Sequence, residues 1–136
     1  MKLDLDCVRD VLLTIEEQQA MKVTGLGQIR SVPLTIRSIA DCLKDYNKAD
    51  IAYTLVILKE GGFVDANISQ TDSIIANIVI NRLTYSGHEY LQSIKDNTNW
   101  NKVKSVATKL GACSLSFVGD IAKSVLSSAI QAALLT

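Results

Sequence analysis

Hydrophobic residues recur at helical spacing along the first part of the chain. One stripe runs from Leu5 to Ile15 and predicts a helix over residues 4–21. Residues 22–33 lose this periodicity and contain glycines and the only proline, so they predict a loop with a brief strand near residues 29–34. Their Gly-x-Gly lacks a third glycine and a preceding strand, which favours a plain turn over a phosphate-binding loop.

Two further helical patterns each follow a residue that can cap a helix start. Thr35 precedes a short pattern that we expect to end near Tyr46, and Asn47 precedes a third helix over residues 48–60. Gly61 and the glycine after it can end that helix. Two short helices joined by a tight turn predict a helix-turn-helix.

The pattern changes to alternation after the third helix. Residues 63–70 place apolar and polar side chains on opposite sides, which predicts a half-buried strand. Residues 71–73 predict a turn, and residues 74–83 return as a second strand. A β-hairpin directly after a helix-turn-helix is typical of the wing in a winged-helix fold.

A β-rich run ends and a new helix begins within residues 83–91, LTYSGHEYL. Thr84 can cap this helix. Ser86 is an alternative cap, because Glu89 three residues later completes the pattern of a capping box. We expect the helix to extend to about Ile94.

Another helix is predicted after an interruption at residues 96–99. We expect it to begin near Trp100, which anchors it on the rest of the protein, and to end at Gly111. Lys102 and Lys109 are expected on its solvent face. Its expected buried stripe consists of Val103, Val106, Ala107 and Leu110.

Residues 115–135 are apolar on nearly all sides. Asp120 and Lys123 near one end leave an uninterrupted apolar run that is short for a bilayer-spanning helix, so a membrane is not the expected partner. Small residues repeat every four positions and would allow another helix to approach closely. We therefore expect a homo-oligomer formed through this helix. The residues expected at that contact are Ser124, Val125, Ser128, Ala132 and Leu135.

The composition fits one soluble globular protein. Hydrophobic residues make up 48% of the 136 and charged residues 21%, which is enough for a real core. We expect an α+β, mainly α fold, a winged helix-turn-helix with a β-hairpin wing and additional C-terminal helices. Residues 1–96 would form the winged-helix domain. Residues 97–136 would form a helical extension that packs on it or mediates self-association.

The charge distribution bears on DNA binding, which a winged helix usually performs with its third helix in the major groove. The chain has 14 basic and 14 acidic residues, so it lacks the excess of positive charge expected of a nucleic-acid-binding protein. Val56 and Ile57 on the expected outer face of the third helix cannot bind phosphates. A protein partner is therefore an alternative to double-stranded DNA. The candidate DNA-binding residues are Lys48, Tyr53, Thr54, Lys59, Arg82, Lys102 and Lys104.

No pattern predicts catalysis, a metal or a cofactor. The three cysteines form no C-x-x-C pair, and the chain has one histidine, His88, as a further possible ligand, so we expect no zinc site. We expect all three thiols to lie in the core. His88 has no nucleophile placed by a recognised motif and is expected to be a partly exposed helix residue. A chain with scattered cysteines and without a charged-then-apolar leader is expected in the cytoplasm.

Several segments resemble a bacterial and phage-associated family, the domain of unknown function number 2513. They are the opening residues 1–6, residues 51–53 in the third helix, the junction at residues 83–91, and residues 96–102, DNTNWNK. The resemblance implies a winged-helix-like architecture and carries no catalytic residues. Three functions remain open: a DNA-binding, transcription-regulator-like protein of phage or mobile-element origin, a protein-interaction module, and a membrane-active effector that acts through residues 115–135.

Overall fold

The protein has an α+β, mainly helical architecture, as expected from its sequence. A computed structural model describes residues 2–111 and 114–136. The helices of the described residues are α1 (Leu5–Gln18), α2 (Ile36–Cys42), α3 (Lys48–Glu60), α4 (Tyr85–Ile94), α5 (Asn97–Leu110) and α6 (Leu115–Leu134). The strands are β1 (Ala20–Val23), β2 (Ile29–Val32), β3 (Leu34–Thr35), β4 (Val64–Thr71) and β5 (Ile74–Leu83).

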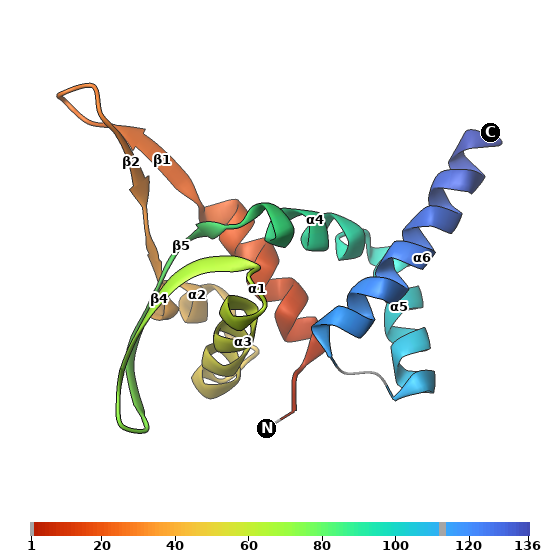
Figure 1. Cartoon of the computed structure of the whole chain (residues 1–136), viewed down its shortest axis with the longest axis horizontal. Coiled ribbons are helices and arrows are strands. Elements are labelled where there is room, and N and C mark those ends of the chain that lie inside the picture. The colour runs from red at the N-terminus through yellow and green to blue at the C-terminus, as the bar shows by residue number, and fades with distance from the viewer. Residues whose placement is uncertain (1, 112–113) are drawn as a thin grey trace.

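Helix α1 lies at the centre of the molecule, with α2, α3, α4 and β5 packed around it (Figure 1). It begins where Asp4 accepts a hydrogen bond from the backbone N–H of Cys7 at 3.2 Å, which satisfies one of the free donors of the first turn. Its buried side chains continue the hydrophobic stripe of the sequence. They include Cys7, Val8, Val11, Leu12 and Ile15.

The hairpin of β1 and β2 corrects the prediction for residues 19–33. Helix α1 ends at Gln18, and the expected loop is instead a two-stranded antiparallel ribbon in which Val23 pairs with Ile29. Both side chains are exposed, so core packing imposes no hydrophobic periodicity that the sequence could reveal. The strand expected near residues 29–34 is present as β2 and β3.

Helices α2 and α3 begin at the residues expected to cap them. Thr35 and Ser38 form a reciprocal capping box, and the Asn47 side chain accepts from the Asp50 backbone N–H at 2.8 Å. The bounds of α3 agree with the prediction. Helix α2 ends at Cys42, earlier than expected, and Tyr46 in the following turn donates to the Asp10 carboxylate at 2.7 Å.

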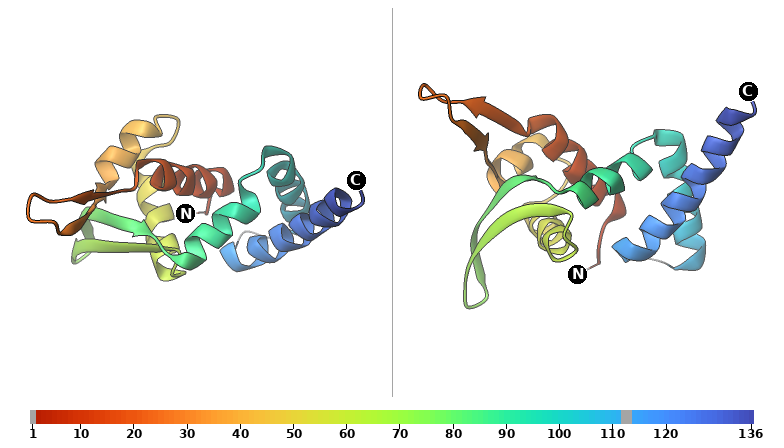
Figure 2. Two further views of the ribbon diagram at one scale, coloured as in Figure 1. Left: turned by 90° about the horizontal axis from the view of Figure 1, so that it is seen from above. Right: turned by 45° about the horizontal axis from the view of Figure 1, so that its top comes forward.

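The expected hairpin after α3 consists of β4 and β5, and β3 joins the free edge of β5. The strand order is therefore β3-β5-β4, with all pairs antiparallel. The turn between β4 and β5 contains Asp72 in a left-handed conformation (φ 53°). This hairpin and the β1–β2 hairpin project from one end of the molecule, and α5 and α6 lie at the other end (Figure 2).

Helix α4 is capped by Thr84, which resolves the alternative between Thr84 and Ser86. Its hydroxyl accepts from the Gly87 N–H at 3.0 Å and donates to the Gly62 carbonyl at 2.6 Å. A Cβ atom on Gly87 would lie 1.9 Å from the carbonyl oxygen of Phe63. Only glycine therefore allows the first turn of α4 to approach the start of β4 this closely.

Helix α5 starts earlier than predicted. Asp96 accepts from the Asn99 N–H at 2.9 Å and caps a helix whose first turn is the polar stretch that we expected to interrupt the chain. The helix ends at Gly111, as expected, with a left-handed glycine (φ 67°). Trp100 is buried as predicted, but Leu110 is 62% exposed and does not belong to the buried stripe.

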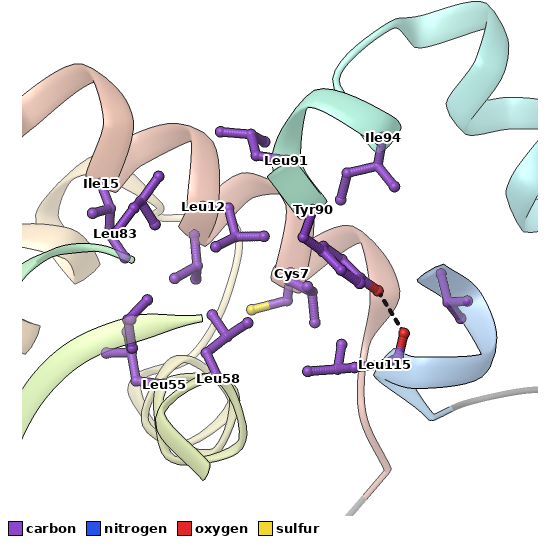
Figure 3. Packing of buried hydrophobic residues seen from close by; sticks show 14 of the residues in the cluster. Cys7, Leu12, Ile15, Leu55, Leu58, Leu83, Tyr90, Leu91, Ile94 and Leu115 are labelled. Carbon is purple, nitrogen blue, oxygen red and sulfur yellow. Dashed lines mark hydrogen bonds between the residues drawn. The ribbon is translucent and has the colours of Figure 1, made fainter. Parts of the chain in front are cut away.

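One hydrophobic core extends from α1 and α3 to α6 (Figure 3). Tyr90 of α4 occupies the end of this core next to α6, where its ring lies 4.8 Å from that of Phe63. Its hydroxyl donates to the Leu115 carbonyl at 3.1 Å. Burial raises the pKa of Tyr90, so the hydroxyl remains a donor. Among the described helices, none has the length and apolar character needed to cross a bilayer.

Candidate interaction surface

A broad groove lies between the C-terminal half of α3, helix α4 and the first half of α6. Its volume is about 1280 Å³, which exceeds the roughly 300–1,000 Å³ typical of small-molecule pockets. From α3 it receives Tyr53 and Ile57, which stand beside the buried face of that helix and are half-buried. We refer to it below as the α3–α4–α6 groove. Its size suits a segment of polypeptide better than a small molecule.

The inner part of this groove is aromatic and aliphatic. Phe63, Tyr90 and Leu115 line it, and the hydrogen bond from Tyr90 to Leu115 ties α4 to the start of α6. Gly119 faces the Tyr90 ring, since a Cβ atom there would lie 3.1 Å from that ring. The small residue lets α6 pack closely on α4, so the same contact that holds α6 in place also shapes the groove.

Charged groups among the groove-lining residues carry both signs. The acidic ones are Glu60, Glu89 and Asp120, and the basic ones are Lys2 and Lys123. A hydrogen bond to the Glu89 carboxylate raises the pKa of Tyr85, which is exposed on the first turn of α4. His88 also lines the groove and is half-buried, as expected. Within the described ranges, no three potential metal-ligating side chains of His, Cys, Asp or Glu gather at one place.

A second, smaller groove of about 720 Å³ separates α5 from the second half of α6. Ser128 and Ala132 line it opposite Lys102 of α5, so these two small residues of the predicted self-association surface face a helix of their own chain. Val125 lines the same groove and packs against the core. Ser124 is exposed, and Leu135, just after α6, is 88% exposed.

Thr54 corrects one predicted DNA contact. It is 1% exposed, because the buried stripe of α3 includes Ile51, Thr54, Leu55 and Leu58 at helical spacing. Its hydroxyl donates to the Asp50 carbonyl one turn earlier at 2.8 Å, which satisfies the polar group inside the core. Thr54 therefore cannot reach DNA.

The remaining candidates do not form one surface. Lys48 and Lys59 are exposed at opposite ends of α3, and Tyr53 lines the groove. Arg82 on β5 is exposed, with Nε 4.0 Å from an oxygen of Asp65. Lys102 lies on α5, on the other side of the central helix α1 from α3 (Figure 1).

Lys104 is engaged in contacts with its own chain at the protein surface. Its Nζ lies 3.0 Å from Oδ1 of Asp6 and 5.9 Å from the centre of the Trp100 ring. Partial burial raises the pKa of Asp6, but hydrogen bonds from Trp100 and Lys104, together with the positive charges of Lys104 and Arg9, hold it below its ordinary value. These contacts link α1 to α5.

The cysteines differ from one another. Cys7 is buried in the core as expected, and burial raises the pKa of its thiol. Cys42 is exposed, which corrects the expectation of a core residue, because α2 ends there and its buried face consists of Ile36 and Ile39. Cys113 lies outside the described residues.

The β1–β2 arm, residues 20–32, is a surface feature that the sequence pattern did not predict. Lys22 and Arg30 pair directly across it and are both exposed, while Val23 and Ile29 form an apolar pair one position further on. Leu26 at its turn is 88% exposed. The signal available in the sequence was a glycine-containing turn between two short runs with β-branched residues.

The structure thus defines a mainly helical α+β protein with a large apolar groove beside its third helix. Residues 2–114 match the family described as "Hypothetical protein (DUF2513)", and the chain belongs to this family. The match covers α1 to α5 and ends just before α6. An uncharacterized protein of Haemophilus influenzae is 24% identical over 128 residues, which are 93% of this chain and 97% of the relative. No solved structure matches.

Proposed function

We propose that this chain is a non-enzymatic winged-helix protein that acts as a self-associating interaction module. The winged-helix assignment is supported by the order of elements in residues 34–83, in which β3, α2 and α3 precede a hairpin. It is also supported by the sheet order β3-β5-β4, since the first strand pairs with the last strand of the hairpin.

The main support for the proposal is the place where the side chains on the outer face of α3 lie. In a DNA reader this helix presents polar and basic side chains to the major groove. Here that outer face contributes Tyr53 and Ile57, both half-buried, to the α3–α4–α6 groove. Residues 36–60 contain four basic and four acidic side chains, so the helix-turn-helix offers no net positive charge to phosphates.

The uncovered part of α6 supplies a matching apolar surface. Residues 124–136 contain no charged side chain, and Ile130 and Leu134 are 51% and 80% exposed. Large apolar side chains that gather on the end of one helix favour burial against another polypeptide. Every copy of this chain carries an apolar surface of this kind, so two copies can bury these surfaces against each other.

Sedimentation equilibrium of the purified chain, over a wide concentration range, tests this function. We expect a concentration-dependent dimer, together with no retention on mixed duplex DNA at low salt. A monomer at every concentration would contradict self-association. DNA retention that falls steeply with salt would instead favour the second candidate function, described next.

The second candidate is binding of double-stranded DNA through the β1–β2 arm. Lys22 and Arg30 stand directly opposite each other, an arrangement that is destabilising unless an anion lies between or above them. Residues 18–40 contain no acidic side chain. Two-stranded ribbons are known to enter DNA grooves.

The double variant Lys22→Glu/Arg30→Glu tests this alternative. If the arm binds DNA, the variant should lose salt-dependent retention on duplex DNA, because both phosphate contacts become repulsive. Lys109→Glu is the matched control, since that lysine is exposed on α5 at the other end of the molecule. Equal retention of all three proteins would exclude the arm as the DNA contact.

A further inference from the structure

One face of α6 carries both a groove and the apolar side chains that could fill a groove. The first half of the helix lines the α3–α4–α6 groove with Gly119, Lys123 and Leu126. The same stripe continues at helical spacing with Ile130 and Leu134, which project beyond the groove and are exposed. The α6 tail, residues 125–136, borders the groove beside α5 on one side, and its end extends away from the rest of the molecule (Figure 1).

We propose that the α6 tail of one chain occupies the α3–α4–α6 groove of a second copy, and that the second copy returns the same contact. This inference rests on the self-association proposed above and names its surface. A two-fold contact requires one surface patch that is complementary to itself. The stripe from Gly119 to Leu134 meets this requirement, since its first half is a groove wall and its second half is a row of apolar projections.

An antiparallel arrangement of the two α6 helices places each tail in the groove of the other chain. If the helices cross near Ser127, the partner's Leu134 lies beside Gly119 and the partner's Ile130 lies beside Lys123. Gly119 is itself buried against the Tyr90 ring, so the partner's Leu134 would pack on the exposed groove-lining positions beside it, such as Ser116. The aliphatic part of Lys123 can cover an apolar neighbour while its ammonium group stays in water.

The charges and dimensions fit this occupant. The tail has no charged side chain, so its burial adds no unpaired charge, and the five charged residues that line the groove are themselves exposed. The helical part of the tail, residues 125–134, is about 15 Å long at about 1.5 Å per residue, which is close to three helical turns. The reciprocal contact doubles the apolar area that is buried, which favours a dimer over a single weak docking.

The tail cannot fill the groove of its own chain. Helix α6 is continuous from Leu115 to Leu134, and its first half is held on α4 by the hydrogen bond from Tyr90 to Leu115. A continuous helix that forms one wall of a groove cannot also turn back into it. The occupant must therefore come from another molecule.

Charge substitutions in the tail test the proposal in the full-length protein. Ile130→Glu/Leu134→Glu places two carboxylates on the stripe, at positions exposed within a single chain, so folding should be unaffected. We expect dimerisation to weaken by about tenfold or more, because the carboxylates would have to enter an apolar groove. The matched control is Ser124→Glu/Gln131→Glu, which adds the same charge to the same helix at exposed polar positions off the stripe and away from the crossing point.

The groove side needs its own variant. Tyr85→Ala changes an exposed groove-lining residue on α4 and should also weaken dimerisation. Far-ultraviolet circular dichroism and the melting temperature at low concentration confirm that each variant folds. The readout in every case is the dimer dissociation constant from sedimentation equilibrium.

The outcomes separate this inference from the proposed function. A wild-type protein that is monomeric at all concentrations would contradict both. A wild-type dimer that the tail variant leaves intact would uphold self-association and overturn the α6 contact. If the tail variant loses the dimer and Tyr85→Ala keeps it, the tail binds a different surface. That result would contradict the groove as its binding site.

Discussion

The indole N–H of Trp100 donates a hydrogen bond to Oδ1 of Asp6 at 2.9 Å, which joins two residues 94 positions apart. Asp6 lies in the first turn of α1, and Trp100 is the fourth residue of α5. The bond therefore holds the α5–α6 pair on the central helix. The Arg9 side chain reinforces the junction by donating to the Ile94 carbonyl at 2.9 Å and to Asn97 Oδ1 at 2.7 Å.

Trp100→Phe should destabilise the protein while leaving its fold intact. The variant keeps an aromatic ring in the core but removes the donor to a carboxylate, which we expect to cost about 1–2 kcal/mol of unfolding free energy. Urea unfolding followed by circular dichroism measures the change. Asn101→Ala, at an exposed position on the same helix, is the control and should change stability little. Equal midpoints for Trp100→Phe and the wild type would show that the hydrogen bond contributes nothing.

Gly87→Ala should be strongly destabilising, because the added methyl group would lie 1.9 Å from the Phe63 carbonyl oxygen. The backbone of α4 or β4 must shift to relieve this overlap, and we expect a loss of about 1–3 kcal/mol or more. Gly25→Ala is the matched control, since no atom lies within 4 Å of its added methyl group and its φ is not left-handed. Thermal melts of the two variants provide the comparison. Similar melting temperatures would contradict the close approach of α4 to Phe63.

The lowered pKa of Asp6 predicts a contribution to acid sensitivity. Because the pKa is lower in the folded than in the unfolded protein, the ionised Asp6 stabilises the fold above its ordinary pKa of 3.8. That stabilisation is lost as the pH falls below 3.8 and Asp6 becomes protonated in the folded state. Urea midpoints of the wild type and Asp6→Asn should therefore differ at neutral pH and converge toward pH 2. A constant difference across this range would contradict the assignment.

The local elements of this fold follow from the sequence where side chains face the core or cap a helix. The bounds of α3 agree with the prediction because Asn47 caps its start and two glycines follow its end. The β1–β2 hairpin was missed since its apolar side chains face solvent and show no periodicity tied to a core. The start of α5 was misplaced because a polar first turn resembles a loop when the cap, Asp96, is not recognised.

The groove depends on tertiary contacts that no short segment encodes. The sequence identified the apolar character of residues 115–135 and the outward position of Ile57, but it could not show that both border one groove. It also predicted Thr54 as a DNA contact, whereas the Asp50 carbonyl accepts a hydrogen bond from the Thr54 hydroxyl inside the core. The side of α6 that faces the groove is set by Gly119 against Tyr90, a contact between residues far apart in the chain.

Cross-linking between differently marked chains tests the central claim most directly. One chain would carry Leu134→Cys and the other Tyr85→Cys, each with Cys42→Ser and Cys113→Ser, while Cys7 remains buried. With a short bis-maleimide, we expect a covalent heterodimer of these two chains in high yield. A Lys109→Cys chain in place of the Tyr85→Cys chain is the control and should give little product. Equal yields with both chains, or products formed between two Leu134→Cys chains alone, would contradict an α6 tail seated in the groove of a second copy.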